Sequence, residues 1–246
     1  MRALINNAMI DNVMNDTTPE QDLRNLTHSS IAEGQSLPER LENLQKQLAS
    51  LSNDATEIDR NRIKLDIAET LLALENKEQA WTEARGAFDV FLKTECWQEA
   101  VEACNIMFQC EQPASVVALG QGVWLAVTYP VEVDTTVAML NHIIDETPKE
   151  SDGAAVAAVS AHYIADMRAP EDKHESITFL TRHLLTQVAQ RHSNVQNQQE
   201  LDAWLMRLEL KDPEVFLPRL SQVITVMVAN QWWFDRDELR SKLPQD

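Results

Sequence analysis

An internal sequence repeat of sixteen residues is the feature of this chain that most constrains its fold. The segment Ala80–Glu95 (AWTEARGAFDVFLKTE) aligns with Cys96–Glu111 (CWQEAVEACNIMFQCE) at a shift of sixteen residues. The identical pairs are Trp81 and Trp97, Glu83 and Glu99, Ala84 and Ala100, Ala87 and Ala103, and Glu95 and Glu111. Apolar residues recur every three or four positions within each unit, which is the pattern of one helix face. Because a helix and a tight turn together fill such a unit, we expect consecutive antiparallel helices.

Glycine is scarce, and this narrows the fold class further. It supplies 5 of the 246 residues, about 2%, where about 7% is typical of proteins. Hairpins, bulges and phosphate-binding loops depend on glycine, so the chain has little material for them. The composition therefore predicts an all-α protein, which we expect to contain about nine or ten helices.

Prolines and capping residues divide the chain into these helices. Asp54 and Glu57 fit a D-x-x-E capping box at the start of the second helix. Gly120 and Gly122 resemble the beginning of a nucleotide-binding motif, but no third glycine follows, so we interpret them as a close helix crossing. The alanine-rich segment 153–168 is expected to be a central, buried helix. Besides the repeated units, we expect helices near 37–51, 55–74, 114–128, 132–146, 153–168, 171–191, 200–209 and 213–228.

A leucine seam marks the first of these helices. Its members, at alternating four- and three-residue steps, are Leu37, Leu41, Leu44, Leu48 and Leu51. The seam is shorter than the three or four heptads, roughly, that identify a coiled coil. We expect it to pack on the next helix. The alternative is a homodimer formed through Leu41, Leu44 and Leu48.

The formal net charge of −18 constrains the partners. Such a surface repels a phosphate backbone, which argues against nucleic acid and anionic membranes as partners. The negative charge keeps the protein soluble, or alternatively it binds a basic partner. The three cysteines show no C-x-x-C spacing, and Cys104 replaces Phe88 on the inward face of the repeat, so we expect it in the core. No signal sequence or membrane-length apolar run is evident, and we predict a cytoplasmic protein without membrane insertion.

The chain divides into three parts. Residues 1–36 are rich in polar side chains and are expected to form a flexible N-terminal arm. Residues 37–229 form the predicted helical-repeat domain, with a possible joint at the polar segment 193–199. Residues 230–246 are predicted to be an aromatic anchor followed by a short helix.

Motifs that carry chemistry are few. Glu171 and His174 match half of a di-iron carboxylate pair, but no second E-x-x-H exists. The sequence also lacks H-E-x-x-H, G-x-S-x-G and P-loop motifs. We therefore expect no enzyme, no metal and no cofactor. The alternatives are a helical active site around His142, His162 and Asp166, in which His162 and Asp166 share a helix face, or a regulatory domain that binds a small ligand.

The C-terminal segment contains the sequence NQWWF followed by Asp235, which begins a second D-x-x-E capping box with Glu238. Three adjacent aromatic residues cannot all face one side of a helix or strand. The segment therefore packs on the chain's own helices or anchors a partner. Tryptophan and arginine are frequent hot spots of protein interfaces. The predicted partner-binding residues are Trp232, Trp233, Phe234, Arg236 and Arg240.

The region 62–113 resembles tetratricopeptide-type helical repeats. Ala100, Cys104 and Met107 fit the family's second helix, and Trp97 lies where an aromatic residue precedes that alanine by three. The family's first-helix glycine is absent, and the period is about 32 residues against about 34. The resemblance implies a TPR-like α–α superhelix that binds another protein on a concave face. It is consistent with a non-catalytic scaffold, assembly factor or accessory subunit.

Overall fold

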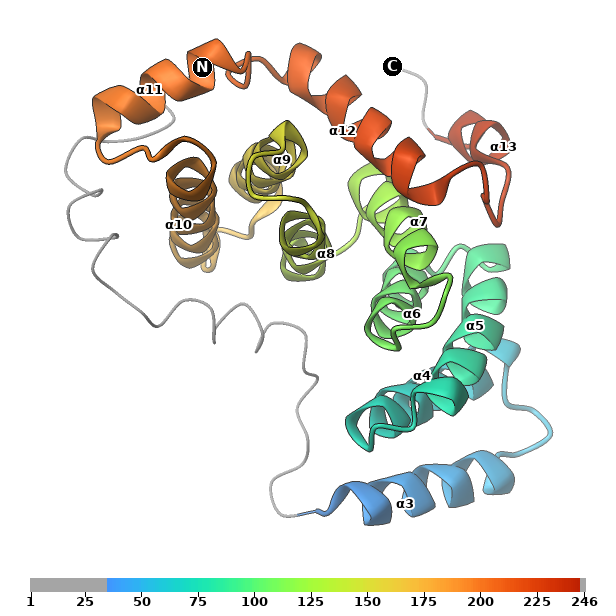
Figure 1. The fold of residues 1–246 in the computed structure, drawn as a ribbon. Coiled ribbons are helices and arrows are strands. Elements are labelled where there is room, and N and C mark those ends of the chain that lie inside the picture. The colour runs from blue at the N-terminus through green and yellow to red at the C-terminus, as the bar shows by residue number, and fades with distance from the viewer. Residues whose placement is uncertain (1–34, 244–246) are drawn as a thin grey trace.

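The computed structural model describes residues 35–243, which form eleven α-helices and contain no strand (Figure 1). The helices are α3 (Leu37–Ser50), α4 (Glu57–Ala73), α5 (Lys77–Lys93), α6 (Trp97–Gln109), α7 (Ser115–Thr128), α8 (Val133–Glu146), α9 (Asp152–Arg168), α10 (His174–Ser193), α11 (Gln198–Arg207), α12 (Pro213–Val228) and α13 (Arg236–Ser241). The all-α prediction is confirmed. The predicted N-terminal arm lies outside the described residues, except for Gln35 and Ser36.

Consecutive helices from α3 to α10 pack as antiparallel neighbours in two layers. Helices α4, α6, α8 and α10 form one layer, and α5, α7 and α9 form the other (Figure 1). After α11 the chain runs back over the array, so that α12 lies on both α7 and α9. The sequence repeat describes the first part of this arrangement, and the returning α12 was not predicted.

The cap of α4 differs from the predicted one. Thr56 is the N-cap residue, and it forms a reciprocal capping box with Asp59. The predicted box of Asp54 and Glu57 is wrong because Asp54 lies in the preceding turn, where the Ala55 amide donates to the Ser52 carbonyl at 3.1 Å. Both pairs satisfy the same sequence pattern, and the turn decides between them.

Glutamate replaces glycine at several helix ends. Glu75, Glu95, Glu111 and Glu209 follow α4, α5, α6 and α11 with φ angles of 60°, 58°, 54° and 56°. This left-handed conformation closes a Schellman-type end, as where the Cys96 amide donates to the Phe91 carbonyl at 2.9 Å. A side chain in this region costs roughly 1–2 kcal/mol. The echo of Glu95 in Glu111 thus reflects a shared helix ending.

Small residues let neighbouring helices approach closely. Ala84 and Ala100, at equivalent positions of the sixteen-residue repeat, are fully buried. A Cβ atom on Gly122 would lie 2.4 Å from Met139 Cε and 2.6 Å from Cys104 Cβ, and one on Gly120 would lie 2.5 Å from Val228 Cγ2. The interpretation of these glycines as close crossings is confirmed. We call Gly120 and Gly122 the glycine crossing.

The other aligned positions of the repeat, Phe88 with Cys104 and Trp81 with Trp97, divide into two groups. Phe88 and Cys104 are fully buried, as expected. Trp81 and Trp97 are half-buried because they lie at the edge of the core, where Trp97 stacks on Tyr129 at 3.8 Å between ring centroids. The tryptophan repeat therefore forms an edge of the core and not its centre.

Helix boundaries near α10 also differ from expectation. Helix α10 begins at His174 and not at 171, because the Lys173 amide donates to the Pro170 carbonyl in a turn. Helix α11 begins at Gln198, inside the predicted joint.

Arginines from later helices bind the carboxyl-terminal carbonyls of earlier ones: Arg168 donates to Ala126 and Val127 of α7. No helix in the part of the chain that the structure describes is long and apolar enough to span a membrane.

Candidate functional site

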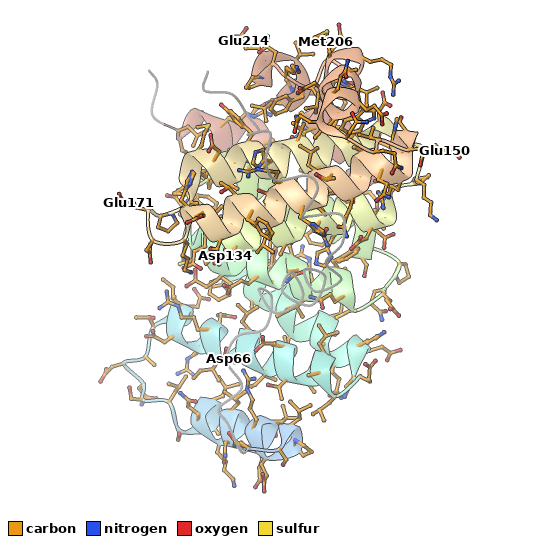
Figure 2. The ribbon with its side chains drawn as sticks, turned by 90° about the vertical axis from the view of Figure 1, so that its left-hand side faces the viewer. Asp66, Asp134, Glu150, Glu171, Met206 and Glu214 are labelled. Carbon is orange, nitrogen blue, oxygen red and sulfur yellow. The ribbon has the colours of Figure 1, made fainter. Side chains whose placement is uncertain are left out.

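A groove of about 570 Å³ lies between α12 and the turn that joins α8 to α9. The first residues of α7 close one side of it. Its apolar wall is formed by Val116, Ile143, Val156, Val223, Val226 and Met227. Figure 2 shows Glu150 of the α8–α9 turn at the outer edge of the array. Four helices therefore build one apolar surface.

Helix α12 supplies apolar side chains on two faces. Leu220, Ile224 and Val228 are buried against the array. Val223, Val226 and Met227 follow at three- and four-residue steps on the face that lines the groove. Val226 is 79% exposed. The helix thus packs on the array through one stripe, and on the groove side Val223 and Met227 are half-buried while Val226 faces solvent.

The apolar surface extends beyond the groove onto its rim. Val116 at the start of α7 is 41% exposed, and like Val226 it is one of the exposed large apolar side chains of the described residues. Ile143 and Val156 are buried and form the floor. Exposed apolar side chains that adjoin an apolar cleft are typical of a binding site.

An ionic network fixes the polar side of the groove. Arg219 lies 3.0 Å from one carboxylate oxygen of Asp152, and His192 lies 3.3 Å from the other. Arg219 also donates to the Leu208 carbonyl at the end of α11. Ser151 caps α9 by accepting a hydrogen bond from the Gly153 amide at 3.2 Å. These contacts hold α9, α10, α11 and α12 together at the groove.

One charge at the groove has no partner among the described residues. The network neutralises Asp152 and Arg219 against each other. Glu146, at the end of α8, is exposed and forms no hydrogen bond or ion pair with any residue between 35 and 243. The groove therefore presents apolar side chains together with one free carboxylate.

The layer of α4, α6 and α8 carries a second acidic region. Burial raises the pKa of the Glu102 carboxyl, the hydrogen bond from Gln98 opposes this shift, and nearby Glu99 adds to it. Arg62 already pairs with Glu99 at 2.6 Å. Asp66 and Asp134 are labelled on this side in Figure 2. Because Gln98, Arg62 and Lys173 engage Glu102, Glu99 and one oxygen of Asp134, the groove is the stronger candidate.

The predicted aromatic residues pack on the chain's own helices. The Trp233 ring meets Phe88 and Trp81 edge to face, with centroid distances of 5.5 and 6.3 Å. Trp232 and Phe234 both contact Trp124, at 6.1 and 5.3 Å. We call Trp232, Trp233 and Phe234 the aromatic clasp. All three rings are half-buried.

Backbone and side-chain bonds anchor the aromatic clasp. Gln121 of α7 donates to the Gln231 carbonyl at 2.9 Å and accepts from the Trp233 amide at 3.4 Å. Asp235 caps α13 by accepting from the amides of Asp237 and Glu238. The segment thus lies on the surface of α5 and α7.

The two predicted arginines contact aromatic rings. The Arg236 guanidinium lies 4.1 Å from the centroid of the Trp232 ring, and that of Arg240 lies 5.6 Å from Trp124. Neither forms an ion pair with a carboxylate among residues 35–243. Binding of a partner by these arginines and the aromatic clasp stays a prediction.

The alternative catalytic residues face different neighbours. His142 Nε2 lies 2.9 Å from Asn105 Oδ1, toward α6, and burial lowers its pKa to about 4. His162 Nδ1 lies 3.0 Å from Thr181 Oγ1, toward α10. Asp166 is exposed and lies 3.3 Å from His174. None of the three lines the groove.

The leucine seam packs on α4, the next helix, as predicted. Leu41, Leu44 and Leu48 contact the core through α4, but each remains half-exposed. Dimerisation through these three leucines stays a prediction.

Comparisons with known proteins identify no relative. No protein-family model, curated protein or solved structure matches this chain. In the part of the chain that the structure describes, no group of three or more histidine, cysteine or acidic side chains could hold a metal ion.

Sequence reasoning missed the groove. Its residues come from four helices and share no motif. One signal was present: α12 carries Val223, Val226 and Met227 in addition to the buried stripe of Leu220, Ile224 and Val228. A helix with two apolar stripes predicts either deep burial or a partner.

Proposed function

We propose that this protein is a non-catalytic helical scaffold, assembly factor or accessory subunit, and that it binds another protein through the groove beside α12. The observation that carries the proposal is the apolar rim of the groove, where Val226 is 79% exposed next to a cleft of about 570 Å³. Such a surface costs free energy in water unless another molecule covers it. The antiparallel helical array supports a tetratricopeptide-like character, which belongs to this proposal.

Site-specific photocrosslinking tests the proposal. A photoreactive amino acid at Val226 is expected to capture a protein in cells that make this chain. The same amino acid at Val215 is the matched control, because Val215 is on α12, is 37% exposed and does not line the groove. Capture should disappear when Val223 is also changed to Asp. Equal capture from both positions, or none from Val226, would contradict the proposal.

A small apolar ligand is the second candidate, since the groove volume falls within the range of small-molecule pockets, roughly 300–1,000 Å³. Such a ligand would rest on the buried floor formed by Ile143 and Val156. A fragment library screened by thermal shift separates the two. Fragments that stabilise the wild type and Val226→Asp equally would favour the small ligand, whereas a protein partner requires the rim.

A further inference from the structure

We infer that the partner presents an amphipathic α-helix whose aliphatic stripe is flanked by a lysine or arginine that meets Glu146. This inference rests on the proposed function and names the chemistry of the partner. It follows from the shape of the apolar surface and from the charge left uncompensated beside it.

The shape favours a helix. Val223, Val226 and Met227 line the groove with the three- and four-residue spacing of a helix ridge, and Val226 is the exposed member. A second helix lying along this ridge would place its own aliphatic side chains between α12 and the α8–α9 turn. Recognition of an amphipathic helix by an apolar groove is a recurring mode of peptide binding. It would cover the rim at Val116 and Val226, which a molecule confined to the cavity would leave in water.

The charge at the groove favours a partner helix with a basic residue beside its aliphatic stripe. Arg219 is the one cationic side chain that lines the groove within residues 35–243, and Asp152 and the Leu208 carbonyl already engage it. It therefore offers nothing to an acidic ligand. Glu146 pairs with no residue between 35 and 243, and the chain as a whole carries a net charge of −18. A cation on the partner gains attraction here without breaking an existing pair.

Selection from a phage-displayed library of helix-stabilised peptides tests the inference on the full-length chain. Val226→Asp serves as the counter-target. Enriched peptides are expected to share an aliphatic stripe at i, i+3, i+4 and i+7 and to carry a flanking lysine or arginine. Acidic flanks, or the absence of a stripe, would overturn the inference.

Affinities of one enriched peptide for groove variants give the quantitative test. Val226→Asp should weaken binding about tenfold or more, and Val116→Asp is the second variant if the first fails to fold. Glu146→Lys should weaken binding about two- to fivefold, the effect of an exposed ion pair. Val215→Asp and Glu214→Lys, on α12 but outside the groove, should bind like the wild type. Equal binding by wild type and Val226→Asp would overturn the inference.

The two proposals fail in different ways. Capture of a protein from Val226 combined with peptides that lack the stripe would reject the helix and keep the protein partner. Self-association of the wild type that Val226→Asp abolishes, measured by analytical ultracentrifugation, would make the occupant a second copy of this chain and overturn the inferred partner. Failure of both capture and selection would reject both proposals.

Discussion

The glycine crossing and the aromatic clasp hold α7 in opposite ways. At the glycine crossing, Gly122 brings α7 against α6 and α8, leaving no room for even a Cβ atom. At the aromatic clasp, large rings lie on the outside of α5 and α7 and remain half-exposed. The glycine crossing is close because glycine has no side chain, whereas the aromatic clasp is stabilised by the apolar area of its rings. An added methyl group should therefore harm one site, and a removed ring should harm the other.

The largest expected effect is at the glycine crossing. Gly122→Val should lower the free energy of unfolding by about 3 kcal/mol, because the new side chain meets Met139 and Cys104 in a closely packed core. Urea denaturation measures the change. Gly86→Ala is the matched control: apart from its chain neighbours and the adjacent backbone of α5, no atom lies within 4 Å of its added Cβ, and it should stabilise α5 by about 0.5–1 kcal/mol. A tolerated Gly122→Val would show that α7 can move away from its neighbours.

Removal of a clasp ring comes next. Trp233→Ala should cost about 2–3 kcal/mol, somewhat less than the loss of a fully buried ring, because Trp233 is half-buried. Trp233→Phe should recover more than half of the loss, since it restores contact with Phe88. Val226→Ala, on the groove side of α12, should change the melting temperature little. If Trp233→Ala melted like the wild type, the aromatic clasp would contribute nothing to stability.

The polar contact between His142 of α8 and Asn105 of α6 provides a third test, because its contribution to stability depends on pH. Burial lowers the pKa of His142 from 6.5 to about 4. The unfolded chain then binds the proton more readily than the folded one, so stability is lost as the pH falls from about 6.5 toward 4. Because His142 is only partly buried, we expect a loss of about 2 kcal/mol. The difference in unfolding free energy between wild type and His142→Gln isolates this effect, and a constant difference would contradict it.

The smallest expected effect concerns a helix end. Glu209→Gly should raise stability by about 0.5–1 kcal/mol, because glycine adopts the left-handed conformation without steric cost. Glu209 forms no ion pair among residues 35–243, so no charge contact is lost. Glu83→Gly, inside α5, should instead lower stability by about 0.5–1 kcal/mol. Thermal unfolding of the two variants should therefore shift in opposite directions.

Much of the helical array could be predicted from local signals. Proline at residue 213 and the cap at Asp212 marked the start of α12, and the paired glycines marked the close crossing of α7. The cap of α4 was misassigned because Asp54 and Thr56 both fit the capping pattern. Local sequence thus predicts where helices lie better than which residue begins them.

The groove and the path of α12 could not be predicted in the same way. Val116, Ile143 and Val226 are far apart in the chain and meet because α12 returns over α7 and α9. Such a return depends on contacts between distant residues, for which a single sequence contains no period. Three adjacent aromatic residues are unusual in a sequence, but the sequence alone does not predict that the aromatic clasp packs on Phe88 and Trp124.

The clasp also constrains the order in which the chain can fold during its synthesis. Gln121 bonds the Gln231 carbonyl, and the Tyr129 hydroxyl donates to the Leu239 carbonyl, each across 110 residues of sequence. Helices α4 to α9 can pair with their neighbours as they leave the ribosome. The part of α5 and α7 that the aromatic clasp covers stays exposed until residues 230–243 have emerged, and during that interval Phe88 and Trp124 are accessible to chaperones.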